Sequence, residues 1–143
     1  MPQLSLLDRL PARQPEPPGS RLLLFALRQM GRHGVDDACA AHAYMTGFGV
    51  RFRRPLVLTR TLVIELAEAS SQPIEIAPWC CPRVTAAESA LLTALARCEA
   101  ESRAAEKLLA DMLGTRDAHG VLAVVQTLAF TFRDLGLPIA IAD

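Results

Sequence analysis

The chain has 143 residues and no formal net charge, with 51% hydrophobic and 21% charged residues. This composition is typical of one globular domain that buries its own core, and four cysteines without the spacing of a secreted disulfide scaffold exclude that class. Apolar runs such as LLLFAL at 22–27 are shorter than the roughly 20 residues of a membrane-spanning helix, and no export signal is recognised, so we expect a cytoplasmic protein without membrane contact.

The N-terminal region is rich in proline, with five prolines among the first 18 residues. Proline interrupts helices, so the sequence predicts a flexible tail at residues 1–19 and a helical domain at residues 20–143. Ser20 is the expected cap of a first helix over residues 21–32. The arginines of this helix, including Arg28, are spaced to form one polar stripe on its exposed face.

Two further helices are expected before residue 71. Asp36 is the predicted cap of an alanine-rich helix that ends near Gly47. Pro55 fits the first turn of the next helix, which reaches about residue 70. Its polar residues Thr61, Glu65 and Glu68 fall at i, i+4 and i+7, which favours a helix over a strand.

The second half of the chain reads as a connector followed by more helices. Residues 70–83 are too rich in proline for a helix, and residues 74–76 are the candidate for a short extended piece. Thr85 with Glu88 three positions later is a capping box, which predicts a helix start. A further segment at about 101–113 continues or restarts this helix, and a last helix begins at Thr115 or Asp117. The predicted fold is therefore all-α: a compact single-domain bundle of five to six helices.

Charge is divided unevenly along the chain. Residues 1–60 carry nine arginines against four acidic residues, whereas residues 61–143 carry six basic against eleven acidic residues, so the halves have net charges of +5 and −5. Their attraction, together with the alanine-rich helix, predicts a homo-oligomer. Arg51, Arg53 and Arg54 precede Pro55 at a helix N-terminus and form a candidate anion-binding site. This cluster is too small to predict nucleic-acid binding.

Adjacent thiols stand out in the segment PWCCPRVTAAE at 78–88. Cys80 and Cys81 lie between two prolines and before a helix N-terminus, where a helix dipole lowers a thiol pKa. Two interpretations are open: a rigid structural corner, or a metal or redox site. Cys39 and His42 share a helix face and could complete a metal site with Cys80 and Cys81 for zinc, iron or haem; otherwise no cofactor is expected.

Catalytic motifs are not recognised in the sequence, so no catalytic residue is predicted. The helical periodicity and the uneven charge therefore favour a non-enzymatic helical protein that acts through homo-oligomerisation or partner binding. A thiol-based metal or redox protein that uses Cys80 and Cys81 is the alternative.

About half of the chain resembles a known family. The words FRRPL at 52–56 and CCPRVT at 80–85 are similar to recurrent words of a family of small alphaproteobacterial proteins that is classed as a domain of unknown function. The resemblance implies one bacterial domain and implies no activity.

The segment QLSLL at 3–7 resembles the short peptide by which bacterial replication and repair proteins dock into the DNA sliding clamp. Gln3, Leu4, Leu6 and Leu7 would be the contact residues, because leucines can enter a preformed apolar groove. Leu7 departs from the pattern, which usually ends in an aromatic residue. The resemblance implies, as a further alternative, a clamp-docking accessory protein. The competing interpretation is a short amphipathic turn packed on the protein's own core.

Overall fold

The computed structural model describes residues 12–141, and these residues form the predicted all-α bundle. The described part holds six α-helices, one short 3-10 helix and one pair of two-residue strands. In chain order the elements are β1 (Ala12–Arg13), α1 (Pro18–His33), α2 (Ala38–Phe48), the 3-10 helix η2 (Gly49–Arg51), α3 (Arg53–Ala69), β2 (Arg83–Val84), α4 (Ala86–Arg97), α5 (Ser102–Leu113) and α6 (His119–Asp134).

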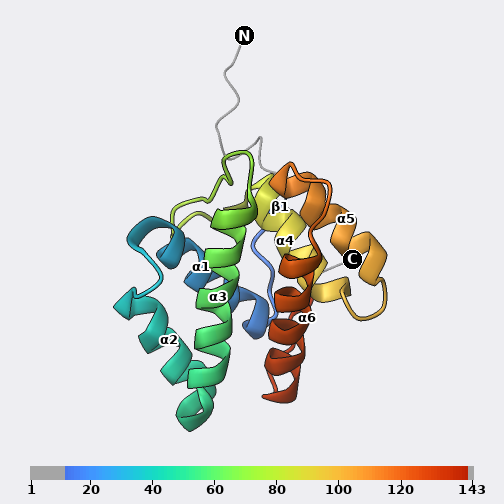
Figure 1. Cartoon of the computed structure of the whole chain (residues 1–143). Helices are drawn as coiled ribbons and strands as arrows, with labels where there is room; N and C mark the ends of the chain where they lie inside the picture. The colour runs from blue at the N-terminus through green and yellow to red at the C-terminus, as the bar shows by residue number, and fades with distance from the viewer. Residues whose placement is uncertain (1–11, 142–143) are drawn as a thin grey trace.

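The helices pack in pairs around one core. Helix α3 lies beside α6, α1 packs on α2, and α4 packs on α5 (Figure 1). Helices α3 and α6 run antiparallel, so that α3 begins at the end of the bundle where α6 ends (Figure 1). Within residues 12–141, no helix has both the length and the apolar character needed to cross a bilayer.

An aromatic cluster joins α2 to α6 in the core. The rings of Tyr44, Phe48 and Phe132 meet edge to face, with centroids 4.9 to 5.9 Å apart. The Tyr44 hydroxyl shares a hydrogen bond of 2.7 Å with Thr59 Oγ1, which itself donates to the Pro55 carbonyl. Burial raises the pKa of Tyr44 above its ordinary range, because the charged form would lose its hydration.

Helix α1 begins earlier than the sequence predicted, and Ser20 does not cap it. Pro17 is the N-cap and Pro18 occupies the first turn, where proline needs no hydrogen-bond partner for its nitrogen. Ser20 is buried instead: its Oγ donates to the Ala140 carbonyl (2.6 Å) and accepts from the Ala140 N–H (2.9 Å). The C-terminal segment therefore lies across the start of α1, and a Cβ at Gly19 would be 2.2 Å from the Leu137 carbonyl oxygen.

Of two other expected helix caps, one is shifted by a residue and one is confirmed. Asp37, and not Asp36, caps α2, and its side chain accepts from the Ala40 N–H at 2.9 Å. The capping box of Thr85 and Glu88 is confirmed, with both reciprocal hydrogen bonds present at the start of α4. Residues 74–76 form no strand, and residues 70–82 contain no helix or strand.

Candidate functional site

The Cys-Cys segment is a corner that the N-terminal region braces; we call residues 78–85 the corner segment. Strand β1 pairs antiparallel with β2, and just beyond the pair Gln14 N–H donates to the Pro82 carbonyl at 2.8 Å. The Gln14 amide also donates to the Cys81 carbonyl at 2.6 Å. Part of the expected tail, residues 12–14, is thus attached to the domain at this corner.

A buried ion pair holds the corner segment to α1 and α4. Arg28 Nε lies 2.8 Å from Glu88 Oε2, Nη2 lies 3.0 Å from Oε1, and the two side chains are 1% and 3% exposed. Arg28 also donates to the carbonyls of Cys81 (2.8 Å) and Arg83 (2.7 Å). The expectation that Arg28 belongs to an exposed polar stripe is wrong, because its guanidinium is the group that satisfies the carbonyls of the turning backbone.

Glu88 accepts hydrogen bonds from backbone as well as from Arg28. Its Oε1 accepts from the Thr85 N–H at 2.9 Å and its Oε2 from the Ala77 N–H at 3.3 Å. Thr85 Oγ1 in turn donates to the Glu75 carbonyl at 2.7 Å. Each carboxylate oxygen of Glu88 therefore accepts two hydrogen bonds, one from Arg28 and one from a backbone N–H. This arrangement stabilises the fold and leaves Glu88 without a free acceptor site for general-base chemistry.

The four cysteines are free thiols in different environments. Cys39 and Cys80 are exposed, whereas Cys81 and Cys98 are buried. Burial, followed by the nearby carboxylate of Glu99, raises the pKa of Cys98 above its ordinary value. Cys80 lines a pocket of about 380 Å³ with Trp79 and Arg21, whereas Cys81 is buried, so the two neighbouring thiols lie in different surroundings.

The candidate metal ligands Cys39, His42, Cys80 and Cys81 are not brought together as a group. In the described part of the chain, one group of three side chains has ligand atoms all within 4.8 Å of one another: Glu106, Asp117 and His119. His119 is 75% exposed, and its ring nitrogens lie 3.1 Å from Glu106 and 3.7 Å from Asp117. These surface contacts between an imidazole and two carboxylates are sufficient to explain the group.

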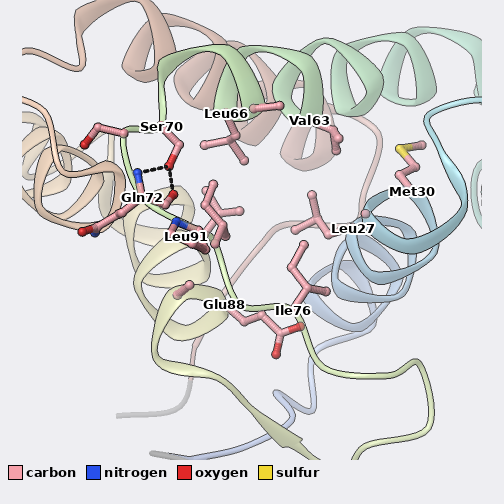
Figure 2. Close-up of a pocket in the computed structure, with 15 residues that line it drawn as sticks. Leu27, Met30, Val63, Leu66, Ser70, Gln72, Ile76, Glu88 and Leu91 are labelled. Atoms are coloured by element: carbon pink, nitrogen blue, oxygen red, sulfur yellow. Dashed lines mark hydrogen bonds between the residues drawn. The ribbon is translucent and has the colours of Figure 1, made fainter.

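A cavity of about 640 Å³ opens between α1, α3 and α4. We call it the central pocket, and we call residues 70–76, which form its fourth wall, the connector. Figure 2 shows Leu66 and Val63 on α3, Leu27 and Met30 on α1, Leu91 on α4 and Ile76 on the connector around one space. Ile76 reaches α1 because Gly31 has no side chain: a Cβ there would be 2.7 Å from Ile76 Cδ1.

The polar side chains of the central pocket already have partners. Ser70 Oγ donates to the Gln72 carbonyl and accepts from the Gln72 N–H (Figure 2). Ser71 Oγ donates to the carbonyl of Gly114 at 2.7 Å, and the Gln72 amide donates to that of Met112 at 2.8 Å. These bonds fix the connector to the end of α5. With Glu88 held by Arg28, the pocket wall presents no uncompensated charge among the described residues.

The central pocket was not foreseen from the sequence, because its walls come from four separate segments. The connector was recognised, but nothing local in Ser70, Ser71 or Gln72 indicates that they attach to α5 some 40 residues later. The one available signal was Gly31 inside a helix, since an interior helical glycine often marks a close approach of another segment.

The predicted anion-site residues do lie around one pocket. Arg51, Arg53 and Arg54 line a cavity of about 290 Å³ together with Val50, Phe130 and Asp134. We call this cavity the arginine pocket. It lies where α3 begins and α6 ends.

The predicted partner-binding residues Gln3, Leu4, Leu6 and Leu7 lie outside the described residues. Sliding-clamp docking stays a prediction, and titration of a peptide of residues 1–10 against purified clamp tests it. Binding that is lost on changing Gln3 and Leu6 together to alanine is the expected result.

Comparison with known proteins gives a family and no activity. No curated protein and no solved structure matches the chain. One family model matches residues 4–122, well over half of the chain, and its description is a family of unknown function. This match confirms the expected membership of a family without an assigned activity. The chain belongs to the family of unknown function DUF6628.

Proposed function

We propose that this protein is a non-enzymatic binding protein that holds a small, uncharged and largely apolar molecule in the central pocket. The observation that supports the proposal most directly is the pocket's size and lining. Its volume of about 640 Å³ falls within the roughly 300–1,000 Å³ of small-molecule sites, and most of the residues that line it are apolar, with leucine, isoleucine, valine and methionine among them.

The lining favours binding over catalysis. In the described part of the chain no cysteine, histidine or lysine lines the pocket, and Glu88 is the one ionisable residue there. Its carboxylate is held by Arg28 and two backbone N–H groups, so it has no free site for a substrate proton. A charged ligand would lose its hydration without gaining a partner, so the preferred ligand is neutral.

The thiol alternative has less support. A metal or redox function needs Cys80 and Cys81 to act together or with other ligands. One thiol is exposed and the other is buried, and among the described residues neither belongs to a group of three side chains whose ligand atoms could bind one metal ion. Elemental analysis of protein purified without chelator tests this: stoichiometric zinc or iron would favour the thiol alternative.

Fluorescence titration with the neutral probe N-phenyl-1-naphthylamine tests the proposed function. We expect saturable binding to one site. Ala67→Phe, which adds a ring at the pocket lining, should weaken binding by about tenfold or more, equivalent to about 1.4 kcal/mol. Ala123→Phe is the matched control, because Ala123 is an exposed alanine on α6 outside the pocket.

The titration has clear contrary outcomes. Absence of saturable binding, or equal weakening by Ala67→Phe and Ala123→Phe, contradicts the proposal. Far-UV circular dichroism of each variant shows whether the helices are retained. Ala87→Leu narrows the same pocket from α4 and should also weaken binding of the probe, which gives a second and independent test.

A further inference from the structure

We propose that the arginine pocket is a second site, which binds an oxyanion, such as a phosphate group, that carries an apolar substituent. This site is separate from the central pocket, since the two share no lining residue. Its charge, the helix that begins there and the exposed apolar side chains beside it all favour such a ligand.

Charge is the first observation. Three guanidinium groups, those of Arg51, Arg53 and Arg54, line the cavity against one carboxylate, that of Asp134, which leaves a net charge of +2. Among residues 12–141, none of these three guanidinium groups has an ion-pair or hydrogen-bond partner, whereas Arg28, Arg60 and Arg133 all do. Three unpaired guanidinium groups around one cavity can share the oxygens of a phosphate, because arginine presents several N–H donors in one plane.

The helix at this place is the second observation. Helix α3 is 17 residues long and begins at Arg53, and its first turn contains no acidic residue. The positive end of its dipole therefore adds to the attraction for an anion. Helix α6 ends nearby with Asp134, and its negative end opposes that attraction. The competing explanation is that the arginines serve only to offset the end of α6, and the experiment below separates the two.

Apolar side chains beside the cavity indicate the rest of the ligand. Val50 is 96% exposed and Phe130 is 49% exposed, and both line the arginine pocket. Arg133 packs over the Phe130 ring, 5.3 Å from its centroid, and pairs with Glu99, so it is engaged outside the cavity. An apolar group attached to the anion would cover Val50 and Phe130. A phosphorylated apolar molecule and a lipid headgroup share this chemistry.

The experiment measures binding of hexyl phosphate to the full-length protein by isothermal titration calorimetry, with inorganic phosphate and hexanol as partial ligands. We expect hexyl phosphate to bind more tightly than either. The triple change Arg51→Gln, Arg53→Gln and Arg54→Gln should lower the affinity by about tenfold or more, because charge-assisted hydrogen bonds are lost. Asp134→Asn, which removes the opposing carboxylate, should raise the affinity.

A charge-matched control removes three other exposed arginines: Arg32→Gln, Arg103→Gln and Arg116→Gln. It should leave binding unchanged. Equal losses in both triple variants would show a general charge effect and overturn the proposal, as would an absence of binding at millimolar hexyl phosphate and at vesicles. A lowered melting temperature in the pocket variant, with unchanged hexyl phosphate affinity, would leave the arginines as partners of α6 alone.

Vesicle flotation identifies the source of the anion. Vesicles of phosphatidylcholine with phosphatidylglycerol are compared with phosphatidylcholine alone. Binding to the anionic vesicles that is lost in the pocket variant assigns the site to a lipid headgroup. Binding to hexyl phosphate without vesicle binding assigns it to a free phosphorylated molecule.

Discussion

The buried pair of Arg28 and Glu88 gives the most demanding test of the structure. Glu88→Gln keeps the size of the side chain but leaves the Arg28 charge without its counterion. Arg28→Met leaves the carboxylate unpaired and removes the donors to the Cys81 and Arg83 carbonyls. Each change breaks a pair whose side chains are 1% and 3% exposed, so solvent cannot replace the lost partner without opening the fold.

The expected cost of either single change is about 3–5 kcal/mol in the free energy of unfolding, as for other buried pairs that lose one partner. That is a large part of the about 5–15 kcal/mol by which a typical domain is stable. The double variant buries no unpaired charge. Its cost should therefore be lower than the sum of the two single costs, by about 1–3 kcal/mol.

Urea unfolding followed by far-UV circular dichroism measures all four proteins of this cycle. Costs below about 1 kcal/mol for both single variants would be those of an exposed pair, and they would show that the pair is hydrated. Additive costs in the double variant would show that Arg28 and Glu88 do not interact. Either result refutes the assignment of this pair as the support of the corner segment.

Three other predictions follow from the described contacts. Thr85→Ala removes the cap of α4 and the bond to the connector, and should cost about 1–2 kcal/mol in urea unfolding; an unchanged midpoint would contradict the capping role. Because burial raises the pKa of Tyr44, the unfolded chain loses the phenol proton first as pH rises. Stability should then fall above the ordinary pKa of 10.0, with Tyr44 contributing about 1.4 kcal/mol per pH unit, and Tyr44→Phe should remove this contribution and leave the shallower slope of other buried groups such as Cys98 in urea unfolding series above that pH. Alkylation followed by peptide mass spectrometry should label Cys39 and Cys80 well before Cys98, and early labelling of Cys98 would contradict its burial.

Local signals in the sequence predict the helices correctly. They give a wrong cap where a side chain bonds to a residue that is distant in sequence. The capping box at Thr85 and the stop at Gly114, which has the left-handed conformation expected of a helix end (φ 71°), depend on neighbouring residues and were recognised. Ser20 satisfies the same local rule for a cap, but the C-terminal segment 120 residues later engages its hydroxyl. Propensity has no information about such a contact.

Dependence on residues distant in sequence also explains which features of the candidate sites the sequence could predict. Arg28 has the spacing of an exposed stripe, and only a carboxylate 60 residues away makes its burial possible. The central pocket likewise depends on how four segments meet. Arg51, Arg53 and Arg54 are neighbours in sequence at a helix start, so their shared cavity could be anticipated from the chain alone.

The side chains that hold the corner segment in place bond to its main chain. Arg28 and Gln14 contact the carbonyl oxygens of Cys81, and Arg28 also contacts that of Arg83, while the side chains of Trp79 and Cys80 remain exposed. Oxygen atoms of the peptide backbone are common to every amino acid. The exposed side chains of this turn can therefore change during evolution while the hydrogen bonds that hold its backbone are retained.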